Sequence, residues 1–267
     1  MNHKKHNRTW RKKDSTEVNL AQEQRLITGY HAIYATINKH PKQIEEIIIA
    51  DSADTKKTHT IKMLAQQHQI KVKILSHKDI DTQYQINQTA LIARAKPFEY
   101  ADLKTELHKL KSQDKALIVV LDHLQDAHNL GAIIRSACGF LADLIVIPKD
   151  RAASINAHAE KASAGATAMV PIAQVTNIKR ALDDIKENGF WSVGALLSAD
   201  TQTLDSFKYP EKTVLVIGNE EKGIAHGILE EIDYKVKIPI SEQLDSLNAS
   251  NAAAIMLYEY RRTIGKR

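Results

Sequence analysis

From Ala116 onward the chain alternates short, almost wholly apolar runs with longer amphipathic segments. Runs such as LIVVL at 117–121 lack the polar residue at every second position that a half-exposed strand carries. Such strands are typical of a parallel sheet covered by helices on both faces, so we predict an α/β domain. The predicted strands are 117–121, 144–147, 168–172, 191–197, 214–217 and 236–240. The predicted helices are 130–140, 155–165, 177–188, 224–232 and 247–262.

Residues 25–95 predict a second, smaller α/β unit, because apolar strands again alternate with helical patterns. The expected helices are 26–37 and 61–68, and the expected strands are 44–50, 72–75 and 89–95. Residues 96–115 are charged, and Pro97 lies near their start, so they predict a linker with one short amphipathic helix. The expected parts are a disordered basic tail (1–24), a small domain (25–95), a linker (96–115) and the larger domain (116–267).

Charge is the first indication of a partner. The net charge is +5, and six basic residues gather near the start of the chain: Lys4, Lys5, Arg8, Arg11, Lys12 and Lys13. A basic tail favours a polyanion such as RNA, although charge alone leaves open a basic enzyme with a small substrate. The single cysteine, Cys138, excludes an internal disulfide and Cys-rich zinc sites. No run approaches the ~20 apolar residues of a membrane span, so we expect a soluble cytoplasmic protein.

Three polar segments follow predicted strands, where parallel sheets bind ligands. They are 122–131, 218–223 and 239–251. The second has the glycine spacing of a phosphate loop, but Gly223 is followed by Ile-Ala instead of Lys and Ser or Thr. The neighbouring Glu220 and Glu221 would also repel a triphosphate. The segment therefore predicts either a site for a neutral or cationic ligand or a plain strand-to-helix turn.

The other polar residues support few alternatives. There is no GxSxG, and His123 and His128 are five apart, which misses the spacing of a helical metal pair. We interpret both as loop or capping histidines and expect no metal site. Arg135 ends an apolar helical run and is either a surface residue or a phosphate ligand. The last segment has more small polar residues than a helix cap needs: Ser246, Asn248, Ser250 and Asn251.

Taken together, these segments resemble the motifs of the SPOUT methyltransferases, and within them the TrmH-type RNA ribose 2′-O-methyltransferases. Residues 126–132 with Arg135 resemble the first motif, 217–220 with Gly223 the second, and 238–240 followed by 246–250 the third. Residues 28–32 (TGYHA) resemble the opening of the family's L30e-like substrate-binding domain. The resemblance implies a parallel-sheet domain with a trefoil knot, S-adenosylmethionine as cofactor, and a homodimer with its active site near the interface.

The two-domain arrangement resembles most the bacterial enzymes that methylate a guanosine ribose in the peptidyl-transferase loop of 23S rRNA. A tRNA guanosine 2′-O-methyltransferase and a non-catalytic RNA-binding protein of the same fold are the alternatives, and neither a membrane nor DNA is an expected partner. The chain departs from the family pattern at two places. It has Asn87-Gln88-Thr89 where the family often has His-Gln-Gly, and Asn251 where the third motif often has Val. The second departure predicts an added polar group beside the cofactor.

The resemblance also implies roles for individual residues. Arg135 is the expected catalytic residue, binding the target phosphate and stabilising the developing alkoxide. Asn129 would orient Arg135 or the ribose, and Glu220 would hold the guanosine or Arg135. Asn248 and Ser250 would shape the reactive end of the pocket. The expected cofactor-binding residues are Leu196, Gly218, Gly223, Ile238, Ser246 and Leu247.

Overall fold

The computed structural model describes residues 25–86, 89–196 and 201–265. The larger domain contains a seven-stranded sheet in the order β7-β6-β5-β10-β8-β11-β9, and every neighbouring pair is parallel. Its strands are β5 (Ala116–Leu121), β6 (Leu144–Pro148), β7 (Ile172–Val175), β8 (Trp191–Ala195), β9 (Gln202–Thr203), β10 (Lys212–Ile217) and β11 (Tyr234–Lys237). The predicted parallel-sheet α/β fold is confirmed.

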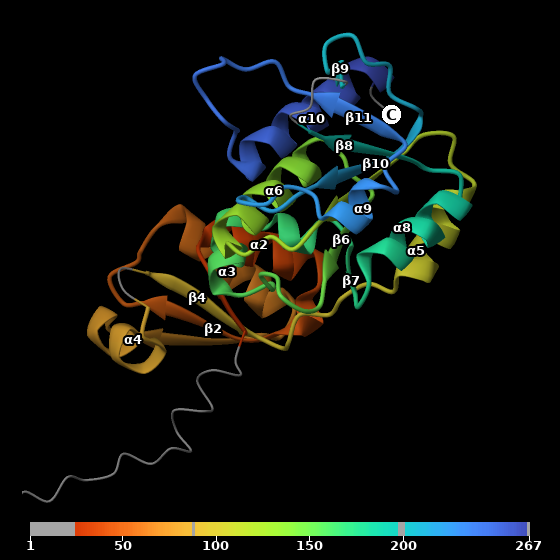
Figure 1. Ribbon diagram of the computed structural model, residues 1–267. Coiled ribbons are helices and arrows are strands. Elements are labelled where there is room, and N and C mark those ends of the chain that lie inside the picture. The colour runs from red at the N-terminus through yellow and green to blue at the C-terminus, as the bar shows by residue number, and fades with distance from the viewer. Residues whose placement is uncertain (1–24, 87–88, 197–200, 266–267) are drawn as a thin grey trace, which may run out of the picture.

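Helices cover both faces of this sheet (Figure 1). One face carries α6 (Ala127–Gly139), α7 (Ala157–Ser163), the 3-10 turn η2 (Ala166–Ala168) and α10 (Ala249–Ile264). The other face carries α5 (Leu103–Lys111), α8 (Ile178–Glu187) and the short α9 (His226–Leu229). Leu117 and Val119 of β5 face the first set, and Ile118 faces the second. Side chains that are buried on both faces explain why the strands read as unbroken apolar runs.

The strand order places the carboxyl ends of β5 and β10 next to each other. From β5 the chain proceeds outward to β6 and β7, whereas β8, β10 and β11 lie on the other side of β5. Connections that leave in opposite directions open a crevice beyond the strand ends, and this is where α/β sheets bind ligands. The loops after β5 and β10 are therefore brought together although about a hundred residues separate them.

A four-stranded sheet in the order β1-β4-β2-β3 forms the smaller domain. Its strands are β1 (Arg25–Thr28), β2 (Ile44–Ala50), β3 (Lys71–Leu75) and β4 (Leu91–Ala95), and only the β2–β3 pair is parallel. Its helices are α2 (Tyr30–Lys39), the 3-10 turn η1 (Pro41–Gln43), α3 (Lys56–Gln67) and α4 (His77–Tyr84). One face packs on α2 and α3, and Ile80 of α4 covers the other.

The two domains are held together by a buried ion pair. Nε of Arg25 donates to Oε1 of Glu160 at 2.7 Å, and neither side chain is more than 6% exposed. Thr167 Oγ1 donates to the second oxygen of Glu160, also at 2.7 Å. Nearby, Gly165 packs so tightly on α2 that a Cβ atom there would lie 2.8 Å from the carbonyl oxygen of His31. The small domain is thus docked on α7 and η2.

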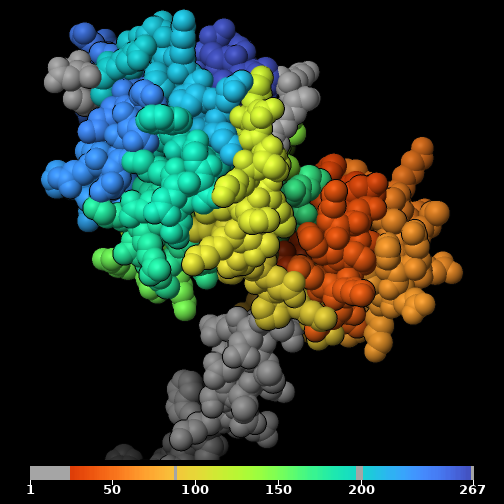
Figure 2. Space-filling model, turned by 90° about the vertical axis from the view of Figure 1, so that its right-hand side faces the viewer, coloured from red at the N-terminus to blue at the C-terminus, as the bar shows by residue number. Residues whose placement is uncertain are grey.

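The segment expected to be a linker lies on the surface of the larger domain, where it runs as a yellow band in Figure 2. Within it, α5 places Leu107 and Leu110 in the apolar cluster beneath α8, and both are almost fully buried. Ala101 forms an isolated bridge with Ala173 of β7. The expected amphipathic helix is present, and its apolar side chains are part of the larger domain's core.

Three predicted elements were wrong in position or length, because short apolar runs are ambiguous between strand and helix. The expected helix 26–37 starts at Tyr30, since Arg25–Thr28 pairs with β4 and Gly29 turns the chain at a φ of +86°. The expected strand 168–172 is shifted: η2 ends at Ala168, and the strand starts at Ile172, after Pro171. The predicted helix 224–232 is reduced to four residues, His226–Leu229. The helix α4 and the strand β9 were not predicted.

Some expectations lie beyond what the structure describes. The basic tail and the Asn87-Gln88 pair are outside the described residues. The knotted path that the resemblance implies stays a prediction. Across the described ranges, no helix combines the length and the apolar character that crossing a membrane requires.

Candidate functional site

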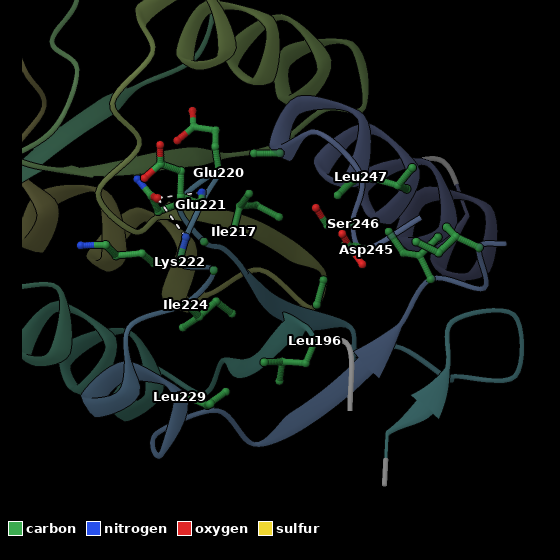
Figure 3. Close-up of a pocket in the computed structure, with 18 residues that line it drawn as sticks. Leu196, Ile217, Glu220, Glu221, Lys222, Ile224, Leu229, Asp245, Ser246 and Leu247 are labelled. Atoms are coloured by element: carbon green, nitrogen blue, oxygen red, sulfur yellow. Dashed lines mark hydrogen bonds between the residues drawn. The ribbon is translucent and has the colours of Figure 1, made fainter. Parts of the chain in front are cut away.

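A cleft of about 510 Å³, here called the first cleft, opens at the carboxyl ends of β8, β10 and β11 (Figure 3). Ile217 and Ile224 form part of its wall, together with Leu196 and Leu229. The loop that carries Glu220, Glu221 and Lys222 borders it on one side, and the segment Asp245–Leu247 borders it on the other (Figure 3). An apolar wall with a few carboxylates and hydroxyls at its edge is typical of a small-molecule site.

The first cleft gathers all six residues expected to bind the cofactor. They come from separate segments of the sequence but line the same cavity: Leu196, Gly218, Gly223, Ile238, Ser246 and Leu247. Asn251, expected to add a polar group there, is exposed and is not among the lining residues. That expectation was wrong because Asn251 lies on the outward face of α10, whereas Ala249 and Ala252 face the cleft.

The loop 218–223 of the second motif forms a tight turn in which its two ends are hydrogen-bonded to each other. The backbone N–H of Asn219 donates to the carbonyl of Gly223, and the reverse bond is also made, both at 2.9 Å. A Cβ atom on Gly218 would overlap the carbonyl carbon of Gly223 and the nitrogen of Ile224. Gly223 has a φ of +67°, which residues other than glycine rarely adopt. Glycine is therefore needed at both positions because the backbone of this loop approaches itself closely.

A chain of hydrogen bonds joins the three motifs. Asn129 in α6 is buried, and its Nδ2 donates to Oε1 of Glu220 at 3.0 Å. Its Oδ1 accepts from Nδ2 of Asn248 at 3.2 Å. Asn248 in turn caps α10 by accepting from the backbone and hydroxyl of Ser250. Three of the four predicted catalytic residues, Asn129, Glu220 and Asn248, thus form one contiguous unit.

Arg135, the fourth predicted catalytic residue, does not belong to this hydrogen-bonded unit. It is exposed on α6, lines neither this cleft nor the one described next, and makes no hydrogen bond or ion pair among the described residues. It follows Asn129 by six residues, which places the two side chains on different faces of a helix. Of the roles expected for Asn129 and Glu220, contact with Arg135 is not made within one copy of the chain, and contact with the ribose or the guanosine stays a prediction.

A second cleft of about 660 Å³ lies between the loops that follow β5, β6 and β10. It shares the segment Asn219–Gly223 with the first cleft, so the Glu220 loop is the wall between them. Asn129 also lines it, and so do His123 and Arg151. Sequence reasoning missed Arg151 and classed His123 as a loop or capping residue. A usable signal was the position of His123 at the end of β5, directly after Asp122.

No group of three or more His, Cys, Asp or Glu side chains among the described residues is arranged to hold a metal ion. His128, the other histidine considered from the sequence, is exposed, and its backbone N–H donates to the capping carboxylate of Asp126 at 2.8 Å. The chemistry available at the two clefts is that of amides, carboxylates, hydroxyls, one imidazole and cations.

Comparison with known proteins matches both domains. Residues 116–258 match the model of the SpoU rRNA Methylase family, and residues 26–101 match that of the RNA 2′-O ribose methyltransferase substrate-binding domain. A Bacillus subtilis protein named as a member of the TrmH family of tRNA/rRNA methyltransferases, YacO, is 33% identical over 247 residues. That alignment covers 91% of this chain and 97% of the relative.

Solved structures share the fold. The SpoU methyltransferase AviRb from Streptomyces viridochromogenes aligns with a TM-score of 0.77 at 21% identity, covering 92% of this chain and 91% of that one. A tRNA-modifying TrmH/SpoU enzyme from A. aeolicus aligns with a TM-score of 0.52 at 32% identity, covering 60% of this chain and 83% of that one. With matching sequence models over both domains and a relative of nearly equal length, the chain belongs to the SpoU rRNA methylase family, the TrmH/SpoU group of RNA 2′-O-ribose methyltransferases.

Proposed function

We propose that this protein is a cytoplasmic homodimer that methylates the ribose 2′-oxygen of a guanosine in 23S rRNA. The observation that carries the proposal is the hydrogen-bonded unit of Asn129, Glu220 and Asn248 beside a cofactor-sized cleft. The methyl donor is S-adenosylmethionine. The guanosine and the 23S target rest on the sequence resemblance and on the paired domains.

The first cleft suits S-adenosylmethionine in size and in chemistry. Its volume of about 510 Å³ falls within the range of about 300–1,000 Å³ that is usual for small-ligand sites. Leu196, Ile217 and Ile238 offer an apolar wall for an adenine ring. Glu220, Glu221 and Asp245 supply negative charge at its edge, which favours a ligand that carries a sulfonium and an ammonium group.

When bound, S-adenosylmethionine supplies an electrophilic methyl group. The chain's own residues must then position the ribose and assist loss of the 2′ proton. The bond from Asn129 fixes Glu220 at the wall that both clefts share, where the cofactor and the target nucleotide would meet. Arg135 is a poor base, because an arginine guanidinium stays protonated in proteins, so we assign it to the target phosphate and the developing alkoxide.

A second copy of the chain would bring Arg135 to this site. Cys138, one turn after Arg135 on α6, belongs to a group of exposed or half-exposed apolar side chains at the ends of α6 and η2 and on α10. Cys138 Sγ is 3.8 Å from the sulfur of Met169, and the rings of Phe140 and Tyr258 are 6.1 Å apart. Met169 and Tyr258 are both more than half exposed. Apolar side chains near Arg135, which has no hydrogen-bond or ion-pair partner in the described part of the chain, are consistent with a symmetric dimer whose sites are shared.

The presence of the small domain favours rRNA over tRNA. A solved structure described as an rRNA methyltransferase from Sinorhizobium meliloti covers 94% of this chain, whereas the A. aeolicus tRNA-modifying enzyme covers 60%. The small domain is also fixed to the larger one through Arg25 and Glu160, so both can contact one RNA together.

A methyl-transfer assay tests the proposal. Purified protein and tritiated S-adenosylmethionine are incubated with rRNA and with tRNA, each prepared from cells that lack the enzyme, and the 2′-O-methyl position is mapped. We expect label in 23S rRNA at a guanosine. Label in tRNA alone would show that the substrate is tRNA and not 23S rRNA. Label in neither RNA would favour a non-catalytic RNA-binding protein.

Substitution of Gly218 should damage the cofactor site specifically. In Gly218→Ala the new methyl group overlaps backbone atoms of Gly223 and Ile224, so the loop must open. Overlap of this kind costs about 1–3 kcal/mol, and we expect S-adenosylmethionine affinity, measured by calorimetry, to fall about tenfold or more. Gly227→Ala, where a Cβ meets nothing within 4 Å, is the matched control. Unchanged affinity in Gly218→Ala would contradict the assignment of this loop to the cofactor.

A further inference from the structure

The second cleft is lined by residues that do not line the expected cofactor site, among them His123 and Arg151. It opens over the carboxyl ends of β5 and β10, the switch point of the sheet, and its volume of about 660 Å³ exceeds that of the first cleft. The two cavities adjoin at the segment Asn219–Gly223, whose residues line both. A methyl group can pass between two reactants only where they adjoin, so the second cleft is placed to hold the acceptor.

Two residues that line this cleft hold unusual backbone conformations. His123 has a φ of +54° and Arg151 a φ of +52°, a region that residues with a side chain rarely occupy. The side-chain amide of Gln125 donates to both of their carbonyl oxygens, at 3.1 Å to His123 and 2.6 Å to Arg151. Asn219 Nδ2 also donates to the His123 carbonyl at 2.8 Å. Both backbones are therefore fixed by neighbours, as at sites where strain is kept for function.

The imidazole of His123 is oriented as well. Its Nδ1 lies 2.5 Å from Oδ1 of Asp122, and the other oxygen of that buried carboxylate accepts the backbone N–H of Ala225 at 2.7 Å. Nε2 of His123 has no hydrogen-bond partner among the described residues, and the side chain is one-third exposed. A ring held at one nitrogen and open at the other can stack on a base or bond to it.

Charge is distributed across the cleft in a way that suits a nucleotide. Carboxylates of Glu220 and Glu221 lie along the shared wall and can accept from the N–H groups of a base edge. The cations Arg151 and Lys222 are exposed at the rim, where a phosphate of the RNA backbone would pass.

We propose that the second cleft binds the target nucleotide of the RNA, with His123 contacting its base and Arg151 its phosphate. This inference rests on the proposed function. It assigns two substrate-binding residues that lie outside the hydrogen-bonded unit of Asn129, Glu220 and Asn248.

Asparagine variants test the proposal without disturbing the loops, because asparagine tolerates positive φ better than most residues. In His123→Asn and in Arg151→Asn we expect the KM for RNA to rise about tenfold, while kcat changes little. S-adenosylmethionine affinity and the melting temperature should match those of the wild type. Exposed residues on the opposite sheet face provide controls: His108→Asn on α5 and Arg180→Asn on α8 should leave the KM for RNA unchanged.

Three results would overturn the assignment. They are an unchanged KM for RNA in both cleft variants, a fall in kcat alone, and an equal rise in KM in the controls. These results differ from failure of the proposed function, in which the wild-type protein itself transfers methyl groups to no RNA. A wild type that is active, together with cleft variants that keep the wild-type KM, would refute only the placement of the nucleotide.

Discussion

Arg135→Ala should lower methyl transfer to RNA by about a hundred- to a thousandfold, the loss that follows removal of one group that stabilises developing negative charge. S-adenosylmethionine affinity should stay near the wild-type value, because Arg135 lines neither cleft of its own copy. Single-turnover rates and calorimetry measure the two quantities. Loss of cofactor binding in this variant would refute the proposed role of Arg135 in catalysis. Wild-type activity in this variant would show that other residues carry out the reaction.

Mixed dimers decide which copy supplies Arg135. Neither Arg135→Ala nor Glu220→Gln should be active alone. If Arg135 acts in the partner's site, a mixed dimer has one site with both native residues. Random mixing should then restore about one quarter of the wild-type activity, since about half of the dimers are mixed and each has one intact site. If Arg135 acts within its own copy, no mixed dimer contains an intact site, and mixing restores nothing.

The sequence was most informative where one local pattern decides the outcome. The apolar runs of β5 and β10 predicted a sheet buried on both faces, since each strand contributes to both apolar clusters. The motif residues that line the first cleft were also identified, because they follow strand ends that a parallel sheet brings to one edge. Periodicity cannot predict a strand such as β1, whose four residues pair with β4, far away in the sequence.

Contacts between distant residues could not be predicted from the sequence. Nothing near Glu160 in the sequence indicates that it lies fully buried against Arg25, 135 residues away. Likewise, Asn129 and Arg135 share a motif, but the helix directs the first inward and the second to the surface. The place of Arg151 in the second cleft depends on β6 lying beside β5, which is a property of the sheet order.

Glu160→Gln should destabilise the docked arrangement of the two domains by about 3–5 kcal/mol, because it leaves the guanidinium of Arg25 buried without its counter-charge. The loss extends beyond one bond. The same carboxylate accepts from Thr167, and the guanidinium also donates to Oε1 of Gln43 at 3.1 Å and lies 4.8 Å from the ring centre of Phe98. Amide hydrogen exchange should show increased opening of α2 and η2 at their contact, and the KM for RNA should rise as the two domains lose their fixed arrangement.

A double substitution shows whether Glu160→Gln destabilises the protein because it leaves an unpaired buried charge or because the ion pair itself is required. Replacing both partners, as Arg25→Met with Glu160→Leu, removes both desolvated charges and should recover most of the protection that Glu160→Gln loses. The surface pair of Lys179 and Glu231, whose side chains are 53% and 28% exposed and whose nitrogen and oxygen are 2.6 Å apart, is the control, and Glu231→Gln should leave exchange at α2 and η2 unchanged. If Glu160→Gln exchanges like the wild type, the ion pair does not fix the domains, and their packing must rest on the apolar contacts around Gly165.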